Sequence, residues 1–174
     1  MSEIRKSDDY PGFKLKLYAD FEQIHELVLI DVTTGDAITP HEIKFRVPRL
    51  FLDDKLELLS YTLETILAEK VETILSRSAS STRPRDYYDV YTLSKLRWNT
   101  IEFDTLKVAL DNTMKKRESK FSLSDYPIII QTSINSDVQK GLWDKYQRQY
   151  LYAKDITFEE VIDALKTIVE QVIK

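Results

Sequence analysis

The sequence predicts an α+β fold, because strand patterns dominate residues 1–61 and helix patterns dominate residues 62–174. Apolar and polar side chains alternate along Phe13–Tyr18, which is typical of a strand with one buried face. From Leu63 onward, apolar residues instead recur at helical spacing. We therefore expect a small β-sheet followed by a helical domain, with the boundary between residues 61 and 62.

Three further segments complete the predicted sheet. The apolar run Glu26–Val32 is typical of a central strand buried on both faces. The turn signal Thr33–Asp36 ends that strand. Glu42–Val47 predicts a shorter strand that stops at Pro48, and Leu56–Ser60 predicts a fourth.

Five helices are predicted in the second part of the chain. Thr62 is a suitable N-cap for the first, and Pro84 is suited to the first turn of the second. Ser136 and Thr157 begin capping-box signatures. The expected helices cover Leu63–Arg77, Pro84 to about Leu96, Asp104–Lys116, Ser136 to about Lys154, and a last helix from Thr157.

Lys70 lies on the apolar face of the first predicted helix, seven residues after Leu63 and four after Ile66. An ammonium group on a core-facing stripe is costly unless it reaches solvent or meets an anion. Anionic partners follow in the segment 83–89, Arg-Pro-Arg-Asp-Tyr-Tyr-Asp. The polar residues expected on the opposite side of the helix are Glu64, Glu69, Glu72 and Thr73.

Asp86 and Asp89 are three residues apart and share one helix face. Together with four cations they could form a polar cluster between two consecutive helices: Lys70, Arg77, Arg83 and Arg85. One interpretation is a phosphate-handling site, in which cations neutralise a triphosphate and carboxylates hold a metal or accept a hydroxyl proton. The other is a salt-bridge network that holds the two helices together, and spacing alone favours it.

Asp31 lies at the end of the most apolar predicted strand. A carboxylate in that position can bind Mg²⁺ in phosphoryl-transfer chemistry, although an ordinary polar strand end is the commoner case. Two sets of aromatic residues allow base stacking or, more commonly, packing between helices. They are Tyr87, Tyr88 and Tyr91, and Trp143, Tyr146, Tyr150 and Tyr152. The basic patch at Lys115–Arg117 with Lys120 predicts a solvated helix end.

Composition excludes several classes of protein. The net charge of −4 gives no overall basic footprint for nucleic acid, and the absence of cysteine excludes disulfides and thiolate chemistry. The two histidines, His25 and His41, are too few and too far apart to suggest a histidine metal site. No apolar run is long enough to cross a membrane and no signal peptide is visible, so we expect a cytoplasmic location.

Several motifs resemble those of the AbiEii/AbiGii-type nucleotidyltransferase toxins of abortive-infection and type IV toxin–antitoxin systems. The motifs are the segment 63–70, Leu-Glu-Thr-Ile-Leu-Ala-Glu-Lys, then Arg77, and then the segment 83–89. The strand segment 29–38 and the tail 143–158 are also similar, so the resemblance covers nearly the whole chain. It implies a small remnant sheet of a polymerase-β-like nucleotidyltransferase followed by a helical bundle.

The resemblance also implies roles for individual residues. Lys70 would contact the triphosphate, Asp86 would be the late acidic motif assisted by Asp89, and Asp31 would be a strand-borne metal ligand. The nucleotide would also contact Arg77, Arg83 and Arg85. The family implies Mg²⁺ and a nucleoside triphosphate as cofactors, RNA such as tRNA as acceptor, and a cognate antitoxin.

The sequence departs from the family at the Gly-Ser turn and the Asp-x-Asp strand. Neither Gly12 nor Gly35 precedes a serine, and Asp8–Asp9 is adjacent rather than alternating. We therefore expect a chain that matches the C-terminal two-thirds of such an enzyme, is inactive alone, and forms a homodimer or pairs with an N-terminal partner. The alternative is a non-enzymatic binding or antitoxin-like module. Mg²⁺-dependent transfer of labelled nucleotide to RNA by this chain would contradict the expected inactivity.

Overall fold

The computed structural model describes residues 2–4 and 12–174, and these residues confirm the α+β class. The chain divides into two compact units, Met1–Asp36 and Ala37–Lys174. The strands form two separate antiparallel sheets rather than one. The second sheet belongs to the same unit as the helices.

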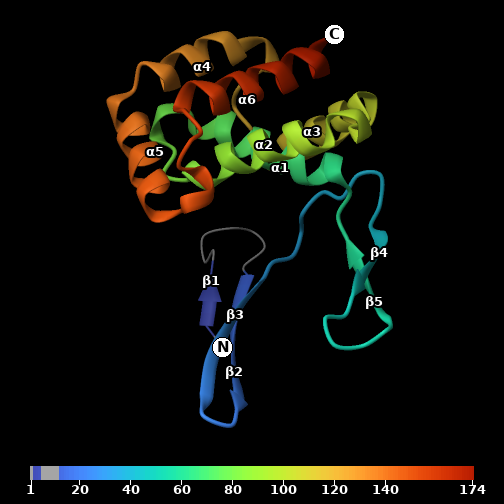
Figure 1. Ribbon diagram of the computed structural model, residues 1–174. Helices are drawn as coiled ribbons and strands as arrows, with labels where there is room; N and C mark the ends of the chain where they lie inside the picture. The colour runs from blue at the N-terminus through green and yellow to red at the C-terminus, as the bar shows by residue number, and fades with distance from the viewer. Residues whose placement is uncertain (1, 5–11) are drawn as a thin grey trace. The chain divides into compact units, whose positions relative to one another are not determined.

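The first unit is a three-stranded sheet in the order β1-β2-β3, made of β1 (Ser2–Ile4), β2 (Gly12–Phe21) and β3 (Ile24–Val32) (Figure 1). The predicted burial of the apolar run on both faces is wrong in this structure, because every residue of β3 is exposed. Among the described strands, β3 pairs only with β2 and therefore forms an edge. Its apolar side chains have no covering layer within the described part of this unit.

The second unit begins with a segment that binds to the start of the first helix. The Thr39 backbone N–H donates to Thr65 Oγ1 at 2.9 Å, and Thr62 Oγ1 donates to the Thr39 carbonyl at 2.8 Å. A hairpin follows, made of β4 (Ile43–Pro48) and β5 (Lys55–Ser60). This hairpin confirms the third and fourth predicted strands.

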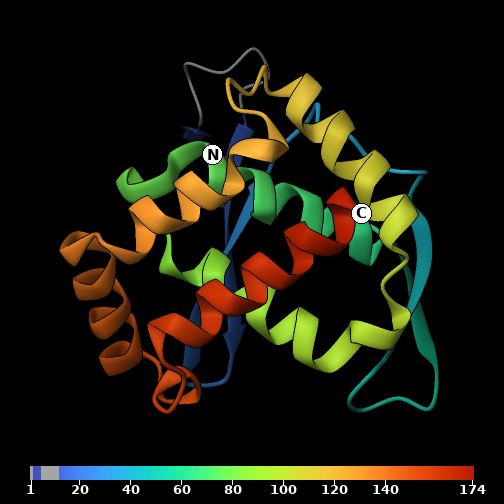
Figure 2. The same ribbon diagram turned by 90° about the horizontal axis from the view of Figure 1, so that it is seen from above.

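The helices form the body of the second unit, and Figure 2 shows α6 with α3 to one side and α4 to the other. Thr62 and Thr157 cap α1 and α6 as predicted. The predicted fourth helix ends at Gln149 rather than Lys154, because the backbone of Tyr150 is extended. The described helices are α1 (Leu63–Arg77), α2 (Pro84–Arg97), α3 (Phe103–Lys116), α4 (Tyr126–Ile134), α5 (Asp137–Gln149) and α6 (Phe158–Ile173).

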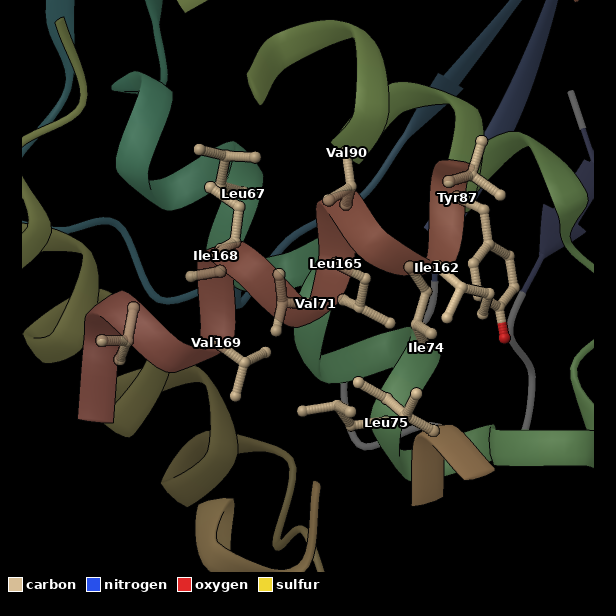
Figure 3. Close-up of a cluster of buried hydrophobic side chains, with 14 of the residues drawn as sticks. Leu67, Val71, Ile74, Leu75, Tyr87, Val90, Ile162, Leu165, Ile168 and Val169 are labelled. Carbon is tan, nitrogen blue, oxygen red and sulfur yellow. The ribbon is translucent and has the colours of Figure 1, made fainter. Parts of the chain in front are cut away.

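The core lies between α1, α2 and α6. In Figure 3, Leu67 and Val71 of α1 lie beside Ile168 and Leu165 of α6. The expectation that all the acidic residues of α1 face away from the core is wrong for two of them: Glu64 is buried and accepts from the backbone N–H of Glu102 at 3.0 Å, and Glu72 is also buried. Helix α1 is covered on more than one side because α3 packs on it as well as α2.

Tyr87 places a hydroxyl in this core. Ser133 lies beside the hydroxyl, but its own hydroxyl donates to the Ile129 carbonyl, and the Tyr87 hydroxyl makes no hydrogen bond of acceptable geometry. Burial raises the pKa of the Tyr87 phenol above its usual value of 10.0. The neutral form is therefore the one that fits the fold.

The variant Tyr87→Phe is expected to be as stable as the wild type at pH 7 or more stable by about 1 kcal/mol, because it removes an unsatisfied buried hydroxyl. The raised pKa of Tyr87 makes the wild type lose stability as pH rises above 10.0, where the phenol ionises in the unfolded chain but not in the folded one. Urea unfolding at several pH values should show a shallower alkaline loss in the variant. A lower stability at pH 7 would contradict the absence of a hydrogen bond.

Candidate active site

Lys70 of α1 meets two carboxylates of α2, as the sequence predicts. Its ammonium nitrogen lies 2.5 Å from Asp89 Oδ2 and 3.5 Å from Asp86 Oδ1. The Lys70 side chain is 23% exposed and the Asp86 side chain only 4%. Pro84 at the start of α2 and the apolar stripe of α1 fix the two helices that bring these charges together.

Two arginines at the start of α2 complete the cluster. Arg83 Nε lies 2.8 Å from Asp86 Oδ2, and Arg85 Nε lies 3.9 Å from Asp89 Oδ2. The contact from Arg83 lacks hydrogen-bond geometry, so the buried Asp86 Oδ2 has no hydrogen-bond partner. Asp86 also lies in the first turn of α2, where the helix dipole favours negative charge. Half of the Arg83 side chain and most of the Arg85 side chain are exposed to solvent.

Two predicted site residues lie elsewhere. Arg77 is exposed at the end of α1, two turns beyond Lys70, and is not part of the ion pairs described above. Asp31 belongs to β3 of the first unit, is half exposed and pairs with Lys14 at 3.3 Å. Across residues 2–4 and 12–174, no group of three or more histidine, aspartate or glutamate side chains is arranged to hold a metal.

A tyrosine cluster borders the charged cluster. The ring of Tyr88 lies 4.8 Å from Tyr152 and 6.0 Å from Tyr146, centroid to centroid. The burial of Tyr146 and Trp143 confirms the predicted packing role of these two residues. Burial raises the pKa of Tyr146, as does the hydrogen bond between the Tyr146 and Tyr152 hydroxyls. The two aromatic sets noted in the sequence therefore meet in space, which their separation along the chain did not indicate.

The fold and the cluster define a class of protein. An α+β chain that places a lysine and two arginines against two carboxylates carries the residue types of a phosphate-transfer site. The family model described as "Nucleotidyl transferase AbiEii toxin, Type IV TA system" matches residues 1–164, and the chain belongs to this family. It is thus a nucleotidyltransferase-type toxin, and membership of a toxin–antitoxin family implies an antitoxin as partner.

The other comparisons add no relative. Neither the curated proteins nor the solved structures contain a significant match to the chain. Among the described helices, none is both long and apolar enough to cross a membrane.

Proposed function

We propose that the cluster of Lys70, Arg83, Arg85, Asp86 and Asp89 binds the triphosphate of a nucleoside triphosphate during nucleotide transfer to RNA, with tRNA as one acceptor. The observation that supports this most is the buried Asp86 Oδ2, which lacks a hydrogen bond although Arg83 Nε lies 2.8 Å from it. Buried polar atoms are normally satisfied, so an unsatisfied carboxylate oxygen is a candidate functional group.

The donors of the cluster suit a phosphate group. The ammonium group of Lys70 has three N–H donors. It donates one hydrogen bond to Asp86 and one to Asp89. The third remains for a phosphate oxygen. Arg85 is 79% exposed and pairs with Asp89 only at 3.9 Å, so its guanidinium can bind phosphate oxygens with little loss of existing contacts.

The carboxylates suit a hard cation. Asp86 and Asp89 lie one helical turn apart and offer the oxygen ligands that Mg²⁺ prefers. When bound, Mg²⁺ would supply positive charge to the triphosphate. The family resemblance also implies Asp31 of the first unit as a metal ligand, and this remains a separate prediction.

The reaction follows from these roles. The hydroxyl oxygen of the acceptor RNA attacks the α-phosphorus, and the bond from that phosphorus to the β-phosphate oxygen breaks. The leaving group is pyrophosphate, and Asp86 or Asp89 accepts the hydroxyl proton. Lys70 and Arg85 stabilise the negative charge that develops on the phosphate oxygens.

Replacing Arg85 with glutamine should weaken nucleoside triphosphate binding by about 10- to 100-fold, because one charge-assisted hydrogen bond is lost. Calorimetry with ATP, GTP, CTP and UTP in Mg²⁺ measures this. Lys95→Gln is the matched control, since Lys95 lies on the same helix over the ring of Tyr91 and outside the cluster. If none of the four nucleotides binds the wild type, the proposal is wrong.

The partner of this chain is a second proposal, based on the first unit. Strand β3 is an edge with exposed apolar side chains, and such edges associate with other chains. We expect a homodimer, or a complex with a chain that supplies the Gly-Ser and Asp-x-Asp strand. Val28→Lys on β3 should convert a dimer to monomers in sedimentation velocity, while Lys16→Glu on β2 should not. If the wild type stays monomeric in sedimentation velocity even at the highest concentration that can be measured, the homodimer is contradicted.

The same contacts support an alternative function. Lys70 already pairs with both carboxylates, which is what a module that only holds its two helices together requires. Such a protein would act as a non-enzymatic binding or antitoxin-like module. The double variant Lys70→Met with Asp86→Asn separates the two cases.

A further inference from the structure

A group of tyrosines continues the charged cluster across the surface of the second unit. We define the tyrosine shelf as Tyr88 of α2 together with Tyr146, Tyr150 and Tyr152. Tyr146 and Tyr150 have ring centroids 4.7 Å apart, and Tyr150 stacks on Tyr152 at 5.3 Å with an interplanar angle of 25°. Tyr88 joins them from a different helix at 4.8 Å from Tyr152.

The shelf extends from the closed core to the surface, because Tyr146 belongs to the core and Tyr152 does not. Tyr152 is 55% exposed although it contacts three other tyrosine rings, and the neighbouring Leu151 is 84% exposed. Packing alone would favour burial of such a ring. Tyr146 beneath it is buried, and its hydroxyl lies 3.1 Å from that of Tyr152. Contacts with three neighbouring rings hold the exposed ring in place.

Helix geometry joins the shelf to the charged cluster. With about 100° of rotation per residue, Tyr88 and Asp89 lie on either side of Arg85 on one face of α2. The charges also act on the shelf, because Asp89 raises and Arg85 lowers the pKa of Tyr146. A ligand with an anionic group at Arg85 and Lys70 would therefore place its neighbouring part on the tyrosine rings.

We propose that the tyrosine shelf stacks on an unpaired nucleobase whose phosphate is held by the adjacent cations. Flat aromatic surfaces beside a cation suit a base with its attached phosphate, since every base offers a π face for stacking. The base belongs either to the nucleoside triphosphate or to a single-stranded RNA end. This inference rests on the proposed function only if the stacked base belongs to the nucleoside triphosphate.

The experiment compares Tyr152→Ala with Tyr152→Phe and Tyr152→Leu in the full chain. Phenylalanine keeps the flat ring, whereas leucine keeps apolar volume without it. The probes are inorganic triphosphate, ATP and a single-stranded RNA octamer, each titrated by calorimetry in Mg²⁺. Circular dichroism first establishes that each variant folds, and the exposure of Tyr152 makes this the expected result.

Loss of the ring should weaken ATP or RNA binding by about 5- to 100-fold in the alanine and leucine variants, while the phenylalanine variant and triphosphate binding stay unchanged. Weakened ATP binding assigns the base to the nucleotide, and weakened RNA binding alone assigns it to the RNA end. If every variant binds ATP and RNA as tightly as the wild type does, the proposed stacking on a base is wrong. If Arg85→Gln leaves ATP and triphosphate binding unchanged, but Arg85→Gln and Tyr152→Ala both weaken RNA binding, the proposed function fails and the stacking proposal stands.

Discussion

Replacing Arg117 with alanine is expected to lower the free energy of unfolding by about 3 kcal/mol. Glu72 is 4% exposed on α1, and its carboxylate accepts from Arg117 at 2.6 Å and from Ser119 at 2.7 Å. The variant leaves this carboxylate buried without a counter-charge. Because the Arg117 side chain is 30% exposed, water reaches the site in part, and the loss should stay at the lower end of the range for broken buried pairs.

Urea unfolding with a matched set of variants measures this loss. Lys120→Ala, three residues further along on the exposed surface, should change stability by less than about 0.5 kcal/mol. The double variant Arg117→Ala with Glu72→Gln should recover part of the loss, because it removes the unpaired charge as well. Equal unfolding midpoints for Arg117→Ala and Lys120→Ala would show that the pair contributes nothing.

The same pair shows which parts of the fold the sequence could predict. N-caps such as Thr62 and Thr157 depend on residues within one turn, so the pattern alone located α1 and α6. The burial of Glu72 depends on Arg117, which lies 45 residues away and was predicted to be part of a solvated helix end. Helix α4 was not predicted, since its apolar run is too short to show a helical period.

The candidate site was predictable to the extent that it is local. Lys70 and its partners are 16 and 19 residues apart, on consecutive helices with clear patterns, so their meeting followed from the sequence. The exposure of β3 and the meeting of Tyr88 with Tyr152 depend on which distant segments pack together. Hydrophobic periodicity carries no information about that choice.

The variant Lys70→Met should lose about 2–3 kcal/mol of stability, and the double variant Lys70→Met with Asp86→Asn should return to within about 1 kcal/mol of the wild type. Methionine leaves the buried Asp86 with Arg83 as its remaining counter-charge at 2.8 Å. Asparagine then removes the charge that needed a partner. Asp89 needs less compensation, because it is 23% exposed and retains Arg85 at 3.9 Å.

Nucleotide affinity in the same two variants separates the two roles of the cluster. If Lys70 holds a triphosphate, the double variant regains its stability but binds ATP at least about 10-fold more weakly than the wild type, because restoring the fold does not restore the ammonium donor. If the cluster only joins α1 to α2, stability recovers and ATP affinity is the same in all three proteins. Measuring unfolding and calorimetric binding on the same preparations therefore decides whether this ion-paired cluster acts on a ligand or only on the fold.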